Sequence, residues 1–138
     1  MQFSSIRKFV KSTIFLSENV MRKGFKVAIY SINNYEKLKD IYLHDSELQN
    51  ILVNYSKKEI EINLITATNQ DTNTREIKLY FNEVRNLHVP MLEPWGSGFY
   101  INSIDLEVED EYIKTTITLN SGDEIRCVSE TIETDYSY

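Results

Sequence analysis

The residues best suited to acid–base chemistry gather around His44, which is followed directly by Asp45 and then by Glu47. A carboxylate can orient an imidazole that acts as a general base, and histidine titrates near neutral pH. With His88, these side chains would line a pocket between a helix and a sheet in an enzyme or a small-molecule-binding domain. Neighbouring residues on an extended chain point to opposite faces, however, so His44 and Asp45 are not expected to pair. The simpler interpretation is a local turn or cap at Asp45-Ser46, with His44 packed where the sheet begins.

Other catalytic and metal-binding patterns are missing from the sequence. A structural zinc site usually takes closely spaced Cys or His ligands, whereas this chain has one cysteine, Cys127, and two histidines. Cys127 is in phase with Ile125 on an expected strand, where cysteine usually packs as a small hydrophobe. Gly96-Ser97-Gly98 has the spacing of neither a nucleophile elbow nor a phosphate loop. We therefore expect no catalytic residue, no metal and no cofactor.

The stretch from Glu93 to Tyr100 is the one most suggestive of contact with another molecule. It places the lone tryptophan, Trp95, among Pro and Gly residues, and Phe99 and Tyr100 follow. Trp and Tyr are enriched at the energetic centres of protein interfaces, because they bring large, rigid apolar surface. Aromatic residues also fill cores, so the alternative is a loop that closes an open end of the core with Trp95 as its plug.

Charge is distributed unevenly along the chain. The net charge is −6 at pH 7, but residues 1–40 carry +5 and residues 41–138 carry −11. A field this negative repels a phosphate backbone, so we expect no nucleic-acid partner. It would speed encounter with a basic protein, although a solvated sheet face kept soluble by charge is the simpler alternative. The acidic side chains assigned to such a contact are Asp105, Glu107, Glu109 and Glu111.

Length and composition indicate one soluble domain. The chain has 138 residues, of which 41% are hydrophobic and 26% charged, which is ordinary for a globular protein. A single cysteine forms no disulfide framework, and no apolar run approaches the roughly 18 residues that span a bilayer. We expect a single cytoplasmic domain over residues 1–138 without membrane association. Residues 1–40 would form a basic helix and strand segment, and residues 41–138 an acidic, β-rich body.

Hydrophobic spacing predicts the elements that position these residues. Apolar side chains recur every three to four residues from about Ser5 to Lys23, which is typical of an amphipathic helix that Gly24 would close. Phe25 to Ile32 favours a strand, and Tyr35 to Asp40 one or two helical turns. From Leu48 onward the period becomes two, which indicates strands.

The predicted turns divide this second part into several strands. Ser56-Lys57-Lys58, Glu109-Asp110-Glu111 and Asn120-Ser121-Gly122-Asp123 are expected turns, and the segment 90–98 with its two prolines interrupts the sheet. The strand that begins near Ile77 should bend before it ends. The fold class predicted is α+β, with an N-terminal helix packed on a mostly antiparallel, meander-like sheet of about six strands.

One further pattern is a resemblance to small uncharacterised bacterial α+β proteins, some of them similar to immunity proteins of toxin systems. It is carried by the run from Leu43 to Leu48 (LHDSEL), the strand pair after it, the Phe81-x-x-Val84 spacing and Trp95-Gly96, and it covers roughly residues 42–107. The resemblance implies a cytosolic, non-enzymatic protein that binds and blocks a partner toxin.

Three functions remain open from the sequence. The first is a protein-interaction module without catalysis, which could be an acidic, immunity-type inhibitor of a basic protein. The second is the small-molecule-binding domain or enzyme with a pocket near His44, Asp45 and His88. The third is a structural homo-oligomer, in which the helix or an exposed edge strand mediates self-association.

Overall fold

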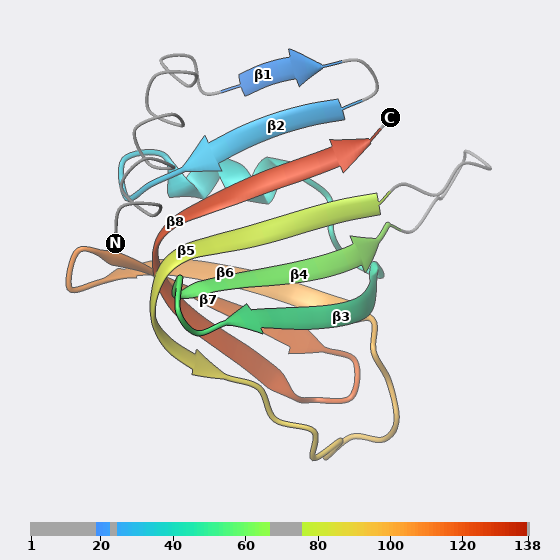
Figure 1. The fold of residues 1–138 in the computed structure, drawn as a ribbon. Helices are drawn as coiled ribbons and strands as arrows, with labels where there is room; N and C mark the ends of the chain where they lie inside the picture. The colour runs from blue at the N-terminus through green and yellow to red at the C-terminus, as the bar shows by residue number, and fades with distance from the viewer. Residues whose placement is uncertain (1–18, 23–24, 67–75, 138) are drawn as a thin grey trace.

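The computed structural model describes residues 19–22, 25–66 and 76–137, and nearly all of its regular structure is antiparallel sheet (Figure 1). A single short 3-10 helix, η1, joins the second and third of the strands in these ranges. The bounds are β1 Asn19–Arg22, β2 Phe25–Tyr30, η1 Tyr35–Asp40, β3 Glu47–Asn54, β4 Glu59–Ile65, β5 Glu76–His88, β6 Ile101–Glu109, β7 Tyr112–Leu119 and β8 Glu124–Ser137.

The long strand β8 lies at the centre of the sheet, and its two halves have different neighbours. Residues 124–129 pair with β7, whereas residues 132–137 pair with β2. The other edge of β8 pairs with β5 along both halves, and β4 and β3 follow beyond β5. The β3-β4-β5 and β6-β7-β8 runs are meanders, as expected, but the β5–β8 and β2–β8 pairs join strands that are distant in sequence.

The sheet curls until the beginning of β3 meets the beginning of β6. Glu47 and Tyr100 form an antiparallel bridge. The amide of Leu48 donates to the carbonyl of Phe99 at 2.8 Å, and the amide of Ile101 donates to the carbonyl of Ser46 at 2.9 Å. Past this junction β3 and β6 diverge, and among the described residues neither acquires another strand along its outer edge.

The core fills the inside of the curled sheet. The strict alternation of β4 places Ile60, Ile62 and Leu64 inside, and β5, β7 and β8 contribute in the same way. Leu38 of η1 and Leu43 after it are buried in the same core cluster. The largest fully buried side chains are Phe81, Leu38, Ile62, Leu64, Leu79, Ile101, Ile113, Ile117, Ile125 and Ile132.

The prediction of an α+β fold with an N-terminal helix is wrong. The last part of the expected helix, Asn19–Arg22, is strand β1, which pairs antiparallel with β2 from Asn19↔Ala28 to Arg22↔Phe25. Residues 5–18 and 23 of the expected helix lie outside the described residues. The longest helix in the described ranges is η1, with six residues. The reason is tertiary pairing: β1 satisfies the backbone groups on the outer edge of β2, and such pairing outweighs a weak local helix propensity.

Several local predictions are confirmed. The strand expected at 25–32 is β2, and the helical turns expected at 35–40 are η1. The expected bend occurs in β5, where Glu83 has a φ of +54° and the register shifts between Val84 and Asn86. The sheet, however, has more strands than the six expected, even within the described ranges.

Candidate functional site

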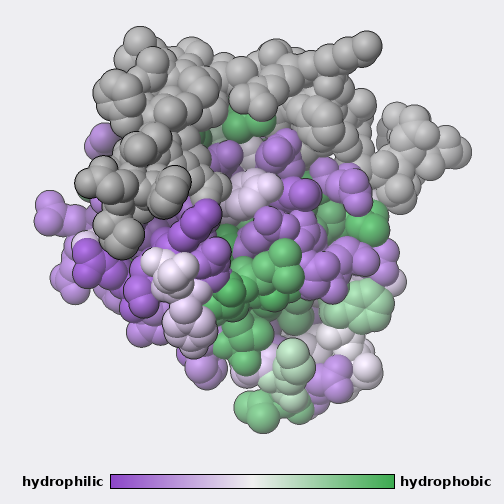
Figure 2. Space-filling view, in the orientation of Figure 1, coloured by the Kyte–Doolittle hydropathy of each residue, from purple (hydrophilic) through white to green (hydrophobic). Residues whose placement is uncertain are grey.

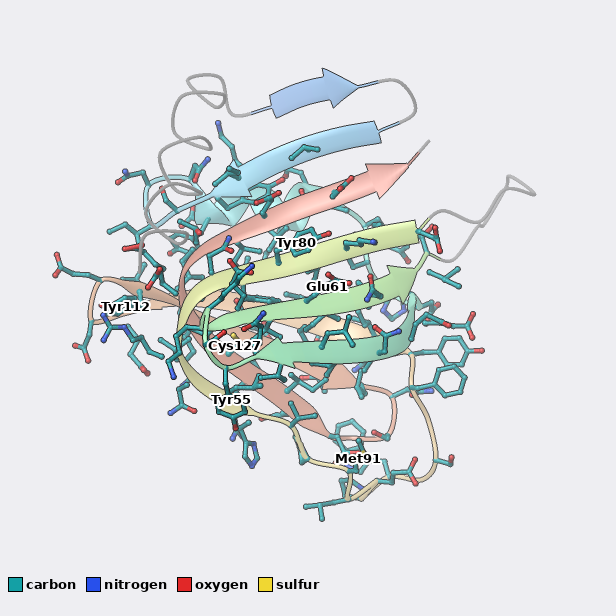
Figure 3. All side chains as sticks on the ribbon, viewed as in Figure 1. Tyr55, Glu61, Tyr80, Met91, Tyr112 and Cys127 are labelled. Atoms are coloured by element: carbon teal, nitrogen blue, oxygen red, sulfur yellow. The ribbon has the colours of Figure 1, made fainter. Side chains whose placement is uncertain are left out.

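The segment between β5 and β6, residues 89–100, carries the most exposed apolar side chains of the described chain, and we call it the Trp95 loop. Met91 is 86% exposed, Leu92 81% and Trp95 69%, and Phe99 and Tyr100 are also exposed. Met91 lies at the outermost part of this loop, away from the sheet (Figure 3). The alternative of Trp95 as a core plug is therefore wrong, because most of the indole faces outward.

The carboxylate of Asp123, in the turn between β7 and β8, fixes the backbone of this loop. It accepts hydrogen bonds from the amide of Leu92 at 2.8 Å, from the amide of Glu93 at 3.0 Å and from Ser121 Oγ at 2.8 Å. Burial alone would raise the pKa of Asp123, but these three hydrogen bonds lower it further than burial raises it. Asp123 is therefore charged at neutral pH, and both of its carboxylate oxygens accept hydrogen bonds that anchor the loop to the turn.

Trp95 rests on the same turn. Its amide donates to the carbonyl of Ser121 at 2.9 Å, and its indole lies over Gly122. A Cβ atom at Gly122 would lie only 2.7 Å from Cδ2 of Trp95 and 2.9 Å from Cγ of Pro94, and the φ of Gly122 is +91°. Glycine at this position therefore lets the loop approach the turn, which supports one face of the indole while the rest stays exposed.

The end of the loop is held in a similar way. The side-chain oxygen of Asn120 accepts from the amide of Tyr100 at 3.1 Å, and the amide of Asn120 donates to the carbonyl of Tyr100 at 2.8 Å. The rings of Phe99 and Tyr100 stack with their centroids 4.8 Å apart. Glu93 closes the loop internally, since its carboxylate accepts from the amide of Gly98 at 3.2 Å. The apolar side chains thus project from a backbone that is fixed before any partner binds.

The acidic residues predicted for partner contact, Asp105, Glu107, Glu109 and Glu111, extend from the middle of β6 to the turn after it, and we call this segment the acidic hairpin. Glu109, at the end of β6, is about 26 Å from Ile101 at about 3.3 Å per strand residue, so the far end of the acidic hairpin is distant from the Trp95 loop. Part of the charge is also offset locally. Lys114 lies 3.6 Å from Glu107 and 3.8 Å from Glu109, and Lys39 lies 4.0 Å from Asp105.

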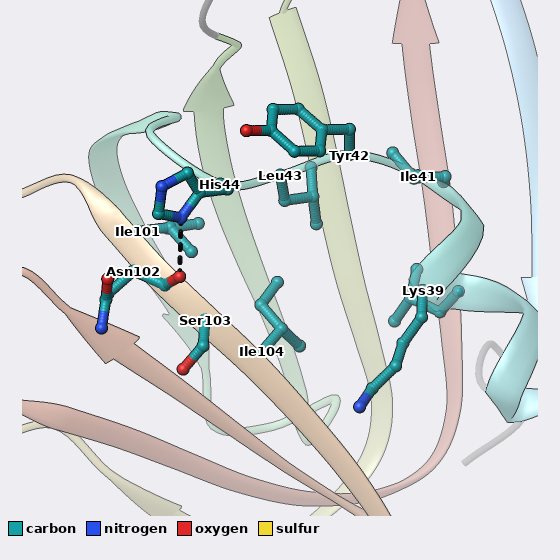
Figure 4. A pocket seen from close by; sticks show the side chains of 10 residues that line it. Lys39, Ile41, Tyr42, Leu43, His44, Ile101, Asn102, Ser103 and Ile104 are labelled. Atoms are coloured by element: carbon teal, nitrogen blue, oxygen red, sulfur yellow. Dashed lines mark hydrogen bonds between the residues drawn. The ribbon is translucent and has the colours of Figure 1, made fainter.

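The alternative pocket around His44 exists only as a shallow hollow of about 200 Å³ between η1, the segment after it and β6 (Figure 4). His44 Nδ1 lies 2.8 Å from the carbonyl oxygen of Asn102, and its Nε2 lies 3.4 Å from Asp45 Oδ1. The expectation that His44 and Asp45 do not pair is wrong, because Asp45 adopts a φ of +65° and the chain turns there. The remaining lining is mostly apolar.

The structure does not bring the other candidate acid–base residues to this hollow. Glu47 is half-buried in the bridge to Tyr100, and His88 lies at the end of β5, opposite Arg126. Cys127 is buried in the core, which raises the pKa of its thiol to about 12. Within the described ranges, no cluster of His, Cys, Asp and Glu side chains is arranged to hold a metal ion. The same ranges contain no helix with the length and apolarity needed to cross a membrane.

Two parts of the loop site are not predicted by the sequence patterns above. The first is the pair Met91 and Leu92, although two apolar residues just after Pro90, outside any alternating pattern, are a usable signal for exposure. The second is Asp123, which in the sequence resembles any other acidic surface residue, yet its carboxylate holds the loop backbone through hydrogen bonds to the amides of Leu92 and Glu93. Comparison of the chain with protein-family models, curated proteins and solved structures finds no match.

Proposed function

We propose that this protein is a non-catalytic binding module that contacts a partner protein through the Trp95 loop. The observation that carries the proposal is the combination of large exposed apolar side chains at Met91, Leu92 and Trp95 with a backbone fixed by Asp123. Burying a Leu or Met side chain contributes about 1.5–3 kcal/mol, and a fixed loop loses little conformational entropy when it binds.

The finer form of the proposal is an acidic inhibitor of a basic protein in the cytoplasm, as the resemblance to immunity proteins implies. The net charge of −6 supports a basic partner. Because the hairpin carrying Glu107 and Glu109 is distant from the loop, its role would be to attract the partner rather than to touch its apolar site. Long-range attraction of this kind raises the association rate and weakens with salt.

A quantitative pull-down from the source lysate tests the proposal, with the wild-type chain compared with Trp95→Ala. We expect a basic protein to be recovered by the wild type and its affinity to fall about 30-fold or more in Trp95→Ala, as for an interface hot spot. Tyr42→Ala is the matched control, because Tyr42 is 61% exposed but lies on the rim of the His44 hollow. Tyr42→Ala should bind as the wild type does.

A second experiment tests whether the acidic side chains of β6 attract the partner. The double variant Glu107→Gln/Glu109→Gln should slow association and flatten its salt dependence while the dissociation rate stays unchanged. Recovery of no partner, or of a partner held equally well by Trp95→Ala, contradicts the loop as the contact site. Loss of binding in Tyr42→Ala alone would move the site to the His44 hollow.

A further inference from the structure

The second half of β3 is an open sheet edge without the protection that such edges usually carry. Residues 50–54 pair with β4 on one side, and no strand of the described chain pairs with them on the other. Natural proteins commonly guard a free edge with charged side chains. The free edge of β6 is guarded in this way by Asp105, Glu107 and Glu109, whereas no charged residue occurs from Leu48 to Asn54.

The sequence of this open edge is symmetric in polarity. It reads Asn50-Ile51-Leu52-Val53-Asn54, with an amide at each end, a β-branched residue next to each amide and Leu52 in the middle. In an antiparallel pair of identical strands centred on Leu52, residues 50 and 54 face each other, as do residues 51 and 53. Every cross-strand pair is then matched, Asn with Asn, Ile with Val and Leu with Leu, which stabilises a ladder of this kind.

Both faces of the sheet next to this edge also expose apolar surface. Leu52, opposite Glu61 on the outer face, is 53% exposed, and Val53, opposite Ile60 on the inner face, is 47% exposed. Val53 borders a hollow of about 220 Å³ that is also lined by Val84 and Leu87 of β5. Figure 2 shows apolar side chains gathered in the middle of this face of the molecule, over β3.

We propose that two copies of this chain associate through β3, antiparallel about a two-fold axis at Leu52, so that their sheets become continuous. The occupant is a second copy rather than a different peptide because the edge is self-complementary in polarity and free of charge, so that two acidic chains meet there without like charges in the seam. Such an isologous interface closes as a dimer and does not propagate.

The expected dimer is weak. Five residues form a ladder of about 17 Å, and the apolar contribution beside it comes mainly from Leu52 and Val53. Such a contact falls below the roughly 1,200 Å² of the smallest stable interfaces, so dimers should dominate only at high protein concentration. The contact is independent of the Trp95 loop, and either surface could operate without the other.

Sedimentation velocity of the full chain over a range of concentrations tests the proposal. The wild type should show a concentration-dependent dimer. Leu52→Lys should weaken it at least tenfold, because the axis places two lysines opposite each other. Val108→Lys is the matched control: Val108 is 47% exposed on the guarded edge of β6, so this variant should associate as the wild type does.

The decisive sample is a mixture of Leu52→Lys with Leu52→Glu. Each variant alone should dimerise at least tenfold more weakly than the wild type, and the mixture should restore the dimer, because Lys and Glu then face each other across the axis. A wild type that stays monomeric at every concentration, or a Leu52→Lys variant that dimerises as strongly as the wild type, overturns the proposal. A mixture that remains monomeric overturns the Leu52-centred register. Leu52 and Val108 are both exposed, so far-ultraviolet circular dichroism should show that all variants remain folded.

Discussion

Replacing Gly122 by alanine should displace Trp95 from its support and destabilise the protein. Two effects contribute. The φ of +91° strains any residue with a Cβ by about 1–3 kcal/mol. The added methyl group would lie 2.7 Å from the indole, so the ring must move away. Trp95 has about a third of its surface covered, on the order of 80 Å², and losing this burial costs up to about 2 kcal/mol.

Gly96→Ala separates the two effects. Gly96 also has a positive φ, +118°, but nothing lies within 4 Å of the position that its Cβ would take. This variant should therefore show the backbone strain alone. Gly122→Ala should be less stable than Gly96→Ala by about 1–2 kcal/mol, which corresponds to a Tm lower by about 3–7 °C for a domain of this size.

Tryptophan fluorescence reports the displacement directly, because Trp95 is the only tryptophan. In Gly122→Ala the emission should shift to longer wavelength and acrylamide quenching should increase, and in Gly96→Ala both should stay close to the wild type. If Gly122→Ala keeps the emission and quenching of the wild type, Trp95 does not rest on Gly122 and the account of a supported indole is refuted.

Two further predictions follow from ionisable groups in the described core and turns. Because the pKa of Asp123 is lowered, its charge stabilises the folded chain fully above the usual value of 3.8, and this contribution is lost as pH falls through the lower folded pKa. Asp123→Asn should remove that part of the acid dependence of stability and speed hydrogen exchange at the amides of Leu92 and Glu93. Unchanged exchange would contradict the anchoring role. Burial raises the pKa of Cys127 from 9.0 to about 12, so its contribution to stability is fully present below pH 9, and the free energy of unfolding should fall between pH 9 and 12 by up to about 1.4 kcal/mol per pH unit. Urea unfolding at pH 8 and pH 10.5 measures this fall, and Cys127→Ala should show a smaller one.

Local pattern was enough to predict most of the strands but neither β1 nor the order of the strands in the sheet. The alternation of Ile60, Ile62 and Leu64 is a short-range signal that directly reflects one buried face. Nothing in such a pattern says which strand lies beside which, and the placement of β8 between β2 and β5 depends on pairs that are 38 to 112 residues apart, from His88↔Arg126 to Phe25↔Ser137. The topology could therefore not be read from periodicity.

The N-terminal error has a different physical origin. Val20 and Met21 continue a helical stripe, yet these residues form β1 because β2 offers a free edge with matching backbone groups. The sequence contains no sign that this edge is available. The candidate site was also predicted only in part. The composition around Trp95 indicated a contact site, but the position of its indole depends on Gly122 and Asp123, which belong to the turn between β7 and β8.

The position of β8 has a consequence for how the chain folds. Ala28 of β2 pairs with Thr134, and Leu79 of β5 pairs with the same residue from the other side. During synthesis more than a hundred further residues must therefore follow β2 before its second partner strand, β8, is complete, whereas β3, β4 and β5 can form their meander early. Contacts of such long sequence separation slow folding and leave apolar strand surface uncovered in the meantime. The growing chain should thus depend most on chaperones during the interval between the completion of β2 and the arrival of β8.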